Sequence, residues 1–224
     1  MIIIFDLDDT LYDEKKFVIS GFKYVSVFLN NLYGWNIKQT FNSLIRILNS
    51  DGRGEVFDTF LKLKEINSKI LKRKCVNTYR HHTPNIFLKK EIKNILINFK
   101  KSEHSIYLLT DGHKVVQKNK INALGIEKFF KKIFITHRYG IKNAKPSTYC
   151  FKIIKKIEKC NWGNMLYIGD NPNKDFVSLK PLGMKTIRIM KGVHAKTRLN
   201  IKFEANFRIN SLAELSSLIK NNFK

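Results

Sequence analysis

Short and almost continuously apolar runs recur along the chain and predict β-strands. They are Ile2–Phe5, Ser105–Leu109, Ile133–Thr136, Met165–Ile168 and Thr186–Ile189. Strands that are buried on both faces of a parallel sheet form unbroken apolar stretches, whereas strands with one solvated face alternate apolar and polar residues. The pattern therefore predicts a parallel sheet that is covered on both sides.

Between these runs the apolar positions follow the spacing of helices. Helices are expected at Leu88–Phe99, Lys114–Leu124 and Tyr149–Ile157. A last helix is expected to begin at the stretch SLAE, where Ser211 and Glu214 are spaced to cap each other's backbone amides. Strands that alternate with helices are typical of a doubly wound α/β fold.

One interval, from Glu14 to Thr83, contains no run that predicts a strand. Helices are expected there at Lys15–Leu32, at Ile37–Leu48, at Glu55–Leu63 and in the stretch that follows, with a loop at DGRG, residues 51–54. A helical insert of roughly 70 residues is close to the lower size limit of a domain. We therefore expect a Rossmann-like core, residues 1–12 and 85–224, and an inserted helical cap domain, residues 13–84.

Polar side chains follow four of the predicted strands. They are Asp6, Asp8 and Thr10 after the first, Thr110 and Asp111, followed by Gly112 with its backbone amide, after the second, Lys145 after the third, and Asp170, Asn171 and Asp175 after the fourth. Ligands of open α/β sheets bind beyond the carboxyl ends of the strands. Carboxylates suit Mg²⁺, and a hydroxyl, backbone amides and a lysine suit phosphate. Because a carboxylate can attack phosphorus while a second one moves protons, the pattern indicates metal-assisted phosphoryl transfer.

These stretches also match a known family. FDLDDT matches its DxDx[TV] motif, LLTDG its second motif, AKPSTYCF its lysine motif and YIGDNPNKDF its GDxxxxD motif, in the family's order. The chain thus resembles the haloacid dehalogenase superfamily, specifically the phosphatases that carry a helical cap after the first motif. The likeness covers essentially the whole predicted core.

The resemblance implies specific roles for four acids. Asp6 would be the nucleophile, and Asp8 would protonate the leaving oxygen and then activate the hydrolytic water. Mg²⁺ would be held by Asp6, by the backbone carbonyl of Asp8 and by Asp170, while Asp175 would ligate it or position its waters. Dehalogenases of the superfamily typically lack an acid at the position of Asp8, so its presence favours phosphoryl transfer.

Other residues would bind the phosphoryl group or complete the site. The resemblance implies that Thr110 and Lys145 hold the phosphoryl group, together with the backbone amides of Asp111 and Gly112. Two further candidates are weaker. Asn171 could orient Asp170 or meet the waters of the metal, but an Asn before Pro also explains itself as a turn. Arg53, between two glycines of the predicted cap, could reach a second anionic group of the substrate.

The charge of the chain leaves a second interpretation open. It has 224 residues, with 42 Lys and Arg against 18 Asp and Glu, and a formal net charge of +24. Such an excess can indicate a nucleic-acid partner. The lysines are scattered, however, and no nucleic-acid-binding motif is visible, so we expect a solvated lysine surface with no specific nucleic-acid partner.

The sequence predicts a Mg²⁺-dependent phosphatase that acts on a small phosphorylated metabolite, a nucleoside monophosphate or a sugar phosphate, through an aspartyl-phosphate. A sugar-phosphate mutase and a basic nucleic-acid-binding protein are the alternatives. No stretch is long and apolar enough to span a bilayer, no export signal is visible, and three unpaired cysteines suit a reducing compartment, so a cytoplasmic location is expected. The oligomeric state is left open.

Overall fold

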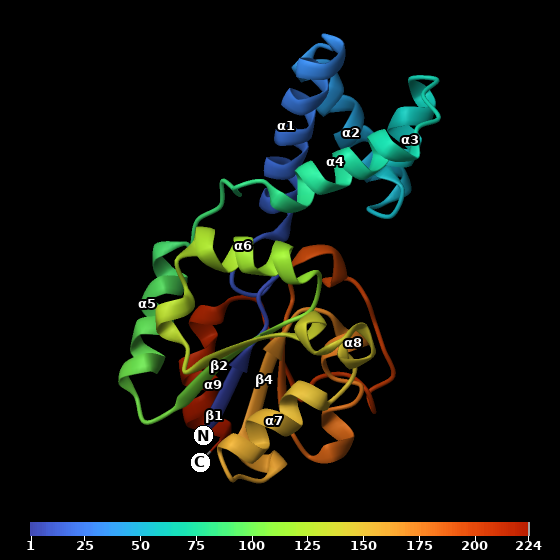
Figure 1. Cartoon of the computed structure of the whole chain (residues 1–224). Coiled ribbons are helices and arrows are strands. Elements are labelled where there is room, and N and C mark those ends of the chain that lie inside the picture. Colours follow the sequence, from blue (N-terminus) through green and yellow to red (C-terminus); the bar gives the residue numbers. More distant parts are fainter. Residues whose placement is uncertain (224) are drawn as a thin grey trace. The chain divides into compact units, whose positions relative to one another are not determined.

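The computed structural model of the chain describes residues 1–223, and its sheet is built from six parallel strands (Figure 1). The strands are β1 (Ile2–Phe5), β2 (Ser105–Thr110), β3 (Lys132–Ile135), β4 (Met165–Gly169), β5 (Lys185–Ile189) and β6 (Phe207–Ile209). Their order in the sheet is β3-β2-β1-β4-β5-β6. The predicted α/β fold is confirmed, and the five predicted strands are present with ends that differ by at most one residue.

The sixth strand, β6, was not predicted. It is three residues long, and of these only Ile209 is buried, while Arg208 is exposed. It lies at the edge of the sheet and pairs only with β5 within the described chain. A short edge strand with one solvated side lacks the continuous apolar run that identified the others.

β1 lies in the middle of the sheet, between β2 and β4, so the carboxyl ends of these three parallel strands lie side by side. β1 pairs in parallel with both β2 and β4, so that Phe5 lies opposite Leu108 on one side and Ile168 on the other. The strand order reverses between β1 and β4, because β2 and β3 extend one way and β5 and β6 the other. Such a reversal is where open α/β sheets bind ligands.

The two faces of the sheet are covered by different helices. The helices of residues 1–223 are α1 (Glu14–Tyr33), α2 (Ile37–Asp51), α3 (Val56–Leu63), α4 (Lys69–His81), α5 (Lys90–Lys101), α6 (Lys114–Leu124), α7 (Tyr149–Ile157), α8 (Pro172–Asp175) and α9 (Leu215–Asn222). On one face, Ile154 of α7 packs in a buried cluster with Ile4 and Tyr167. On the other, Phe5 meets Phe99 of α5 with ring centroids 6.1 Å apart.

Local sequence explains where the last helical segment of the core begins. α6 and α7 have the predicted bounds, and α5 lies two residues later than predicted. Ser211 and Glu214 form the predicted capping box, although the first turn is a 3-10 helix (Leu212–Glu214) that continues into α9. The reciprocal cap satisfies backbone amides that the first turn leaves without partners.

The chain divides into two compact units. One contains residues 1–14 and the chain from Phe87 onward, and the other contains residues 15–86. The second unit is helical and has its own core, a buried cluster that includes Val25, Leu29, Leu44 and Phe60. Its apolar surface is therefore buried mainly between its own helices.

A buried arginine ties the loop after β5 to the sheet. Arg188 is fully buried, and its guanidinium donates to Glu204 at 2.7 Å and to the carbonyl oxygens of His194 and Thr197 at 2.5 and 3.0 Å. Glu204 also pairs with the half-exposed Arg208 at 3.2 Å. Two neighbouring arginines thus meet one buried carboxylate, one inside the protein and one at its surface.

We expect Arg188→Met to lower the free energy of unfolding by about 3–5 kcal/mol, because it leaves Glu204 buried without its inner partner. Arg208→Met, the matched control, should change it by less than about 1 kcal/mol, because its ion pair is solvated. Urea unfolding followed by circular dichroism measures both. Equal losses would contradict the conclusion that Arg188 ties the loop after β5 to the sheet.

Candidate active site

Lys145 is the buried cation to which the acids of the strand ends converge. Its Nζ lies 2.7 Å from Asp175 Oδ1 and 3.1 Å from Asp6 Oδ1, and it donates to the hydroxyl of Tyr167 at 2.9 Å. Burial opposes the charge of this lysine, but Asp175 and Asp6 hold its pKa well above the ordinary value. Lys145 therefore carries a positive charge inside the protein.

Three carboxylates share this small buried space. One oxygen from each of Asp6, Asp170 and Asp175 lies within 4.8 Å of the other two. Burial, followed by repulsion from the other two acids, raises the pKa of Asp170 to about 9. Burial raises the pKa of Asp6 to about 7, although Lys145 opposes the shift. One lysine does not balance three buried acids, and the cluster favours a further cation or protons.

The fold of the fourth motif explains why Asp175 reaches the cluster. A Cβ at Gly169 would collide with the Asp175 carboxylate, so the glycine leaves the space that the acid fills. The backbone amide of Asn171 donates to Asp175 Oδ2 at 2.9 Å, while Lys145 holds the other oxygen. Asp175 is fully buried and held at both oxygens.

The residues present fit a hard divalent cation. All three clustered ligand atoms are carboxylate oxygens, which Mg²⁺ prefers over nitrogen or sulfur ligands. Asp6 and Asp170 follow adjacent strands, and the amide of Asp6 donates to the carbonyl of Ile168 at 2.8 Å. Burial and the repulsion between these acids raise the pKa of Asp6 and of Asp170, and a bound cation would oppose both effects. Asp6, Asp170 and Asp175 are thus the candidate metal ligands.

The carboxyl end of β2 and the loop that follows it contribute the hydroxyl of Thr110 and a turn at Gly112 to the same edge of the sheet. Thr110 is buried, and its Oγ1 has no hydrogen-bond partner within residues 1–223. Gly112 adopts φ 135°, a conformation that favours glycine. A buried hydroxyl without a partner suits a polar ligand, as the phosphate-binding role predicted for Thr110 requires.

The carboxylate of Asp111 accepts hydrogen bonds from neighbouring segments of the protein. Its Oδ1 accepts from Thr136 Oγ1 at 2.6 Å and from the backbone amide of Lys145 at 3.0 Å, and its Oδ2 accepts from Lys174 at 3.2 Å. Burial works against ionisation, but Thr136, Lys145 and Lys174 hold the pKa of Asp111 below its usual range. Asp111 therefore fastens the Lys145 loop to the end of β2.

Asp8 and Asp9, adjacent in sequence, occupy different surroundings. Asp8 accepts hydrogen bonds from Tyr12, Gln117 and Lys120. Burial would raise the pKa of Asp8, yet the Lys120 charge and these hydrogen bonds keep it below the ordinary value. Asp9 has φ 50° and accepts from the backbone amide of Glu14, at the start of α1, at 2.9 Å.

The two weaker candidates lie outside this cluster of side chains. Asn171 accepts from the amide of Asn173 at 3.1 Å, which makes its side chain the cap of α8 and supports its interpretation as a turn residue. Arg53 lies in the other compact unit, on the exposed loop between α2 and α3, and its role in substrate binding stays a prediction.

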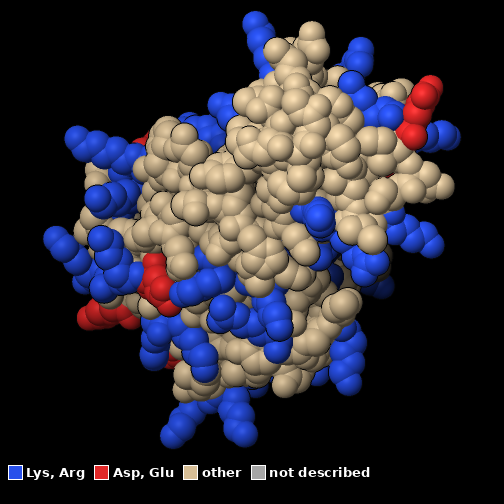
Figure 2. All heavy atoms as spheres, turned by 45° about the horizontal axis from the view of Figure 1, so that its top comes forward, with Lys and Arg blue, Asp and Glu red and all other residues tan. Residues whose placement is uncertain are grey.

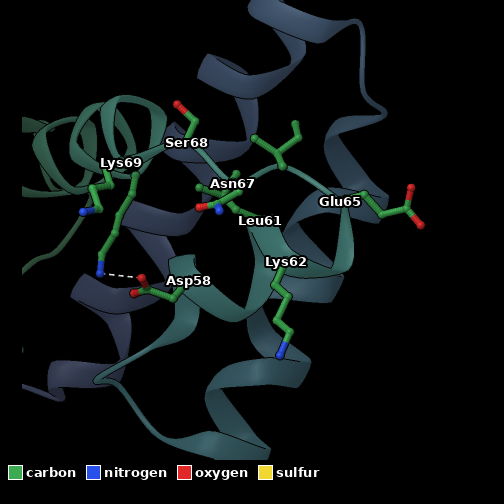
Figure 3. Close-up of a pocket in the computed structure, with 9 residues that line it drawn as sticks. Asp58, Leu61, Lys62, Glu65, Asn67, Ser68 and Lys69 are labelled. Atoms are coloured by element: carbon green, nitrogen blue, oxygen red, sulfur yellow. Dashed lines mark ion pairs between the residues drawn. The ribbon is translucent and has the colours of Figure 1, made fainter.

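The helical unit holds a cavity of its own of about 490 Å³ (Figure 3). It is lined by Asp58, Leu61, Lys62, Glu65, Ile66, Asn67, Ser68, Lys69 and Lys72. Asp58 and Lys72 form an ion pair across part of it. None of the lining residues is a predicted site residue. The cavity is lined by charges of both signs, so the carboxylate cluster is the stronger candidate for the active site.

Lys and Arg are dispersed across the face of the molecule that Figure 2 shows, with few acids between them. The buried acids of the site thus contrast with a basic surface, to which both units of the chain contribute lysines and arginines. No helix in residues 1–223 combines the length and the apolar character that a membrane span needs.

Several residues of the site were not predicted. Tyr167, within an apolar strand, contacts Lys145, and Gln117 and Lys120, within a predicted helix, contact Asp8. Gln117 and Lys120 are three residues apart, and both lie on the buried side of α6 beside Ile121 and Leu124. Polar residues on the apolar face of a helix are the signal that could have identified them.

The family model for haloacid dehalogenase-like hydrolases matches residues 3–189. The chain belongs to this family. The match spans the first strand, the helical unit and the fourth motif, so it includes every predicted site residue. The predicted resemblance is thereby confirmed for this hydrolase.

The curated relatives of the hydrolase are phosphatases. The chain is 31% identical to a glyceraldehyde 3-phosphate phosphatase of Methanocaldococcus jannaschii, over 98% of this chain and 96% of the relative. It is 25% identical to a glyceraldehyde 3-phosphate phosphatase of Pyrococcus furiosus, over 98% and 92%. The predicted enzyme class, a phosphatase of the haloacid dehalogenase-like family, is confirmed.

A solved structure supports the fold over the whole length. The HAD hydrolase YfnB of Bacillus subtilis, whose crystal structure was determined with bound magnesium, has a TM-score of 0.68 to the hydrolase. The two chains share 19% identity, and the likeness covers 97% of each. At this identity the comparison establishes the shared fold.

We expect Mg²⁺ to raise the melting temperature of the wild-type protein, because a ligand that binds only the folded state stabilises it by mass action. Asp170→Ala should abolish this shift, since it removes one of three clustered carboxylates. Thermal unfolding at increasing MgCl₂, with KCl at matched ionic strength, measures the effect. A shift of equal size in Asp170→Ala would rule out the assigned ligand.

Asp9→Ala should lower the free energy of unfolding by about 1 kcal/mol, because the start of α1 loses a carboxylate that accepts from its backbone amide. Turnover should stay within about threefold of wild type, since Asp9 neither attacks phosphorus nor transfers a proton in the expected reaction. Asp9→Asn, which keeps an acceptor oxygen, is the matched control for stability. A loss of turnover as large as that of Asp6→Asn would contradict the division of roles between these acids.

Proposed function

We propose that the chain is a Mg²⁺-dependent phosphatase that hydrolyses a small sugar phosphate through an aspartyl-phosphate on Asp6. The observation that carries this proposal is the buried contact of Lys145 with Asp6, beside Asp170 and Asp175. A cation next to the attacking carboxylate offsets its repulsion from an anionic phosphate.

Asp6, Asp170 and Asp175 would hold the metal, with the backbone carbonyl of Asp8 as a further ligand. When bound, Mg²⁺ supplies positive charge to the phosphoryl oxygens and favours the ionised form of the surrounding acids. Lys145 supplies a second charge from the protein, and its hydrogen bonds to Tyr167 and Asp175 restrain its ammonium group. The hydroxyl of Thr110 would donate to a phosphoryl oxygen.

In the first step an Asp6 oxygen forms a bond to phosphorus while the bond from phosphorus to the substrate oxygen breaks. That oxygen takes the electron pair of the broken bond and accepts the proton of the Asp8 carboxyl group. Asp8 has to take up this proton before the step, because Lys120 and the hydrogen bonds to Asp8 outweigh burial and favour its ionised form. The products are a free alcohol, a phosphorylated Asp6 and an ionised Asp8. Acid catalysis of this kind contributes about 10²–10⁴-fold, and matters most for poor leaving groups such as alkoxides.

In the second step the ionised Asp8 accepts a proton from a water molecule whose oxygen attacks phosphorus. The bond from phosphorus to Asp6 breaks, inorganic phosphate leaves, and both acids return to their starting states. The same carboxyl group thus serves as acid and then as base, as microscopic reversibility requires for a two-step displacement.

The names of the curated relatives supply the proposed class of substrate. Both relatives described above are glyceraldehyde 3-phosphate phosphatases, and the chain aligns with almost all of their length. We therefore place a short sugar phosphate ahead of a nucleoside monophosphate. Residues 13–84 would form the cap that excludes bulk water and selects the substrate.

The test is a phosphate-release assay with Mg²⁺ over a panel that includes glyceraldehyde 3-phosphate, other sugar phosphates and nucleoside monophosphates. Wild type should prefer a sugar phosphate, and Asp6→Asn should lose at least about 10⁴-fold in kcat, because loss of a covalent nucleophile removes the whole pathway. EDTA should abolish turnover and MgCl₂ should restore it.

Full activity of Asp6→Asn would contradict the covalent route. Turnover that survives EDTA would contradict the metal requirement. Conversion of a sugar phosphate to its isomer without release of phosphate would identify a mutase instead.

A further inference from the structure

Helix α6 presents two buried polar side chains to the loop of the first motif. Gln117 and Lys120 lie three residues apart, one turn along the helix, and are 3% and 2% exposed. Burying an amide and an ammonium group is unfavourable unless both find partners. The donor groups of both find the same partner here, the carboxylate of Asp8, while Gln117 Oε1 has no hydrogen-bond partner within residues 1–223.

The contacts restrain both oxygens of Asp8. Oδ1 accepts from Lys120 Nζ at 2.7 Å and from the hydroxyl of Tyr12 at 2.7 Å, and Oδ2 accepts from Gln117 Nε2 at 2.9 Å. A carboxylate offers about four lone-pair positions. Three donors therefore leave one position, on Oδ2, from which a proton can be exchanged with a substrate or with water.

Gln117 also links the first motif to the second. The same amide nitrogen lies 2.8 Å from the carbonyl oxygen of Asp111. A Cβ at Gly112 would lie 2.8 Å from that nitrogen, closer than real contacts allow, so the glycine of the second motif leaves room for it. Gln117 thus relates the position of Asp8 to the loop that bears Thr110.

Lys120 is held from two sides. Besides Asp8, it pairs with Glu14 Oε1 at 3.1 Å. Two carboxylates around one buried ammonium fix its position, and burial, although unfavourable to its charge, is outweighed, so that the pKa of Lys120 is raised. An apolar residue would fill this site at no electrostatic cost. The ammonium charge of Lys120 is therefore explained better by its contact with Asp8 than by a role in packing.

We propose that Gln117 and Lys120 are positioning residues that hold the Asp8 carboxyl group for proton transfer. The inference rests on the proposed function, because it assigns to α6 a role in the acid and base steps of Asp8. Neither side chain needs to touch the substrate, and both act through Asp8.

The experiment compares two leaving groups. One substrate is the alkyl sugar phosphate that wild type hydrolyses fastest in the panel above, and the other is p-nitrophenyl phosphate, whose leaving group needs little protonation. The measured quantity is kcat/KM with saturating Mg²⁺, because it reports the steps up to release of the alcohol or phenol. The variants are Lys120→Met and Gln117→Met, and the matched control is Lys118→Met, a half-exposed residue of α6 that pairs with Glu127.

Lys120→Met should lose about 10²-fold in kcat/KM on the alkyl phosphate, the scale expected for a misplaced catalytic group, and less than about fivefold on the aryl phosphate. Gln117→Met should show the same preference with a smaller loss, and it carries the test if Lys120→Met does not fold. Lys118→Met should retain both rates. In an Asp8→Asn background, Lys120→Met should cause no further loss, because both changes remove the same step.

Equal losses on the two substrates in both variants would overturn the proposal and indicate a structural role only, while the phosphatase itself would stand. A full further loss in the Asp8→Asn background would overturn it as well. Failure of the proposed function gives a different result: wild type would release phosphate from neither substrate, and the proposal would fall with it.

Discussion

The structure of the site depends on placing like charges together in a buried space. Asp6, Asp170 and Asp175 lie within 4.8 Å of one another at their ligand atoms, where burial makes ionised carboxylates costly. Lys145 is the protein's own counter-charge, and it contacts two of the three. The remaining imbalance is what makes the cluster suited to a divalent cation and, through that cation, to a phosphate.

The loops around this cluster hold one another in place through side chains outside the reacting set. Asp111 accepts from the backbone amide of Lys145, and Gln117 bridges Asp8 and the carbonyl of Asp111. Tyr167 meets Lys145 from within the sheet. Most of these links join segments that are far apart in sequence, so the shared hydrogen bonds restrain different motifs relative to one another, which is what positioning of reacting groups requires.

The basic surface and the acidic site are complementary. A net charge of +24 creates a field that attracts anionic ligands over distances longer than any single contact. The three clustered acids are buried and lie beside Lys145, so they add little negative potential at the surface. Both features would favour the small phosphorylated substrate proposed above, since the field would raise its local concentration and the site would bind its charge at short range.

The sequence by itself was enough to predict five of the six strands and to name the acids at their ends as site candidates. Buried parallel strands are continuous apolar runs, and the ligands of such folds bind at the strand ends. The sequence could not identify β6, a short edge strand, nor the roles of Gln117, Lys120 and Tyr167, whose partners lie far away in the chain. Only the tertiary structure showed that Asp9 supports the start of α1 while Asp8 faces α6. Adjacent residues separate in this way because the loop turns at Asp9, where φ is positive, and local sequence does not reveal which way each side chain points.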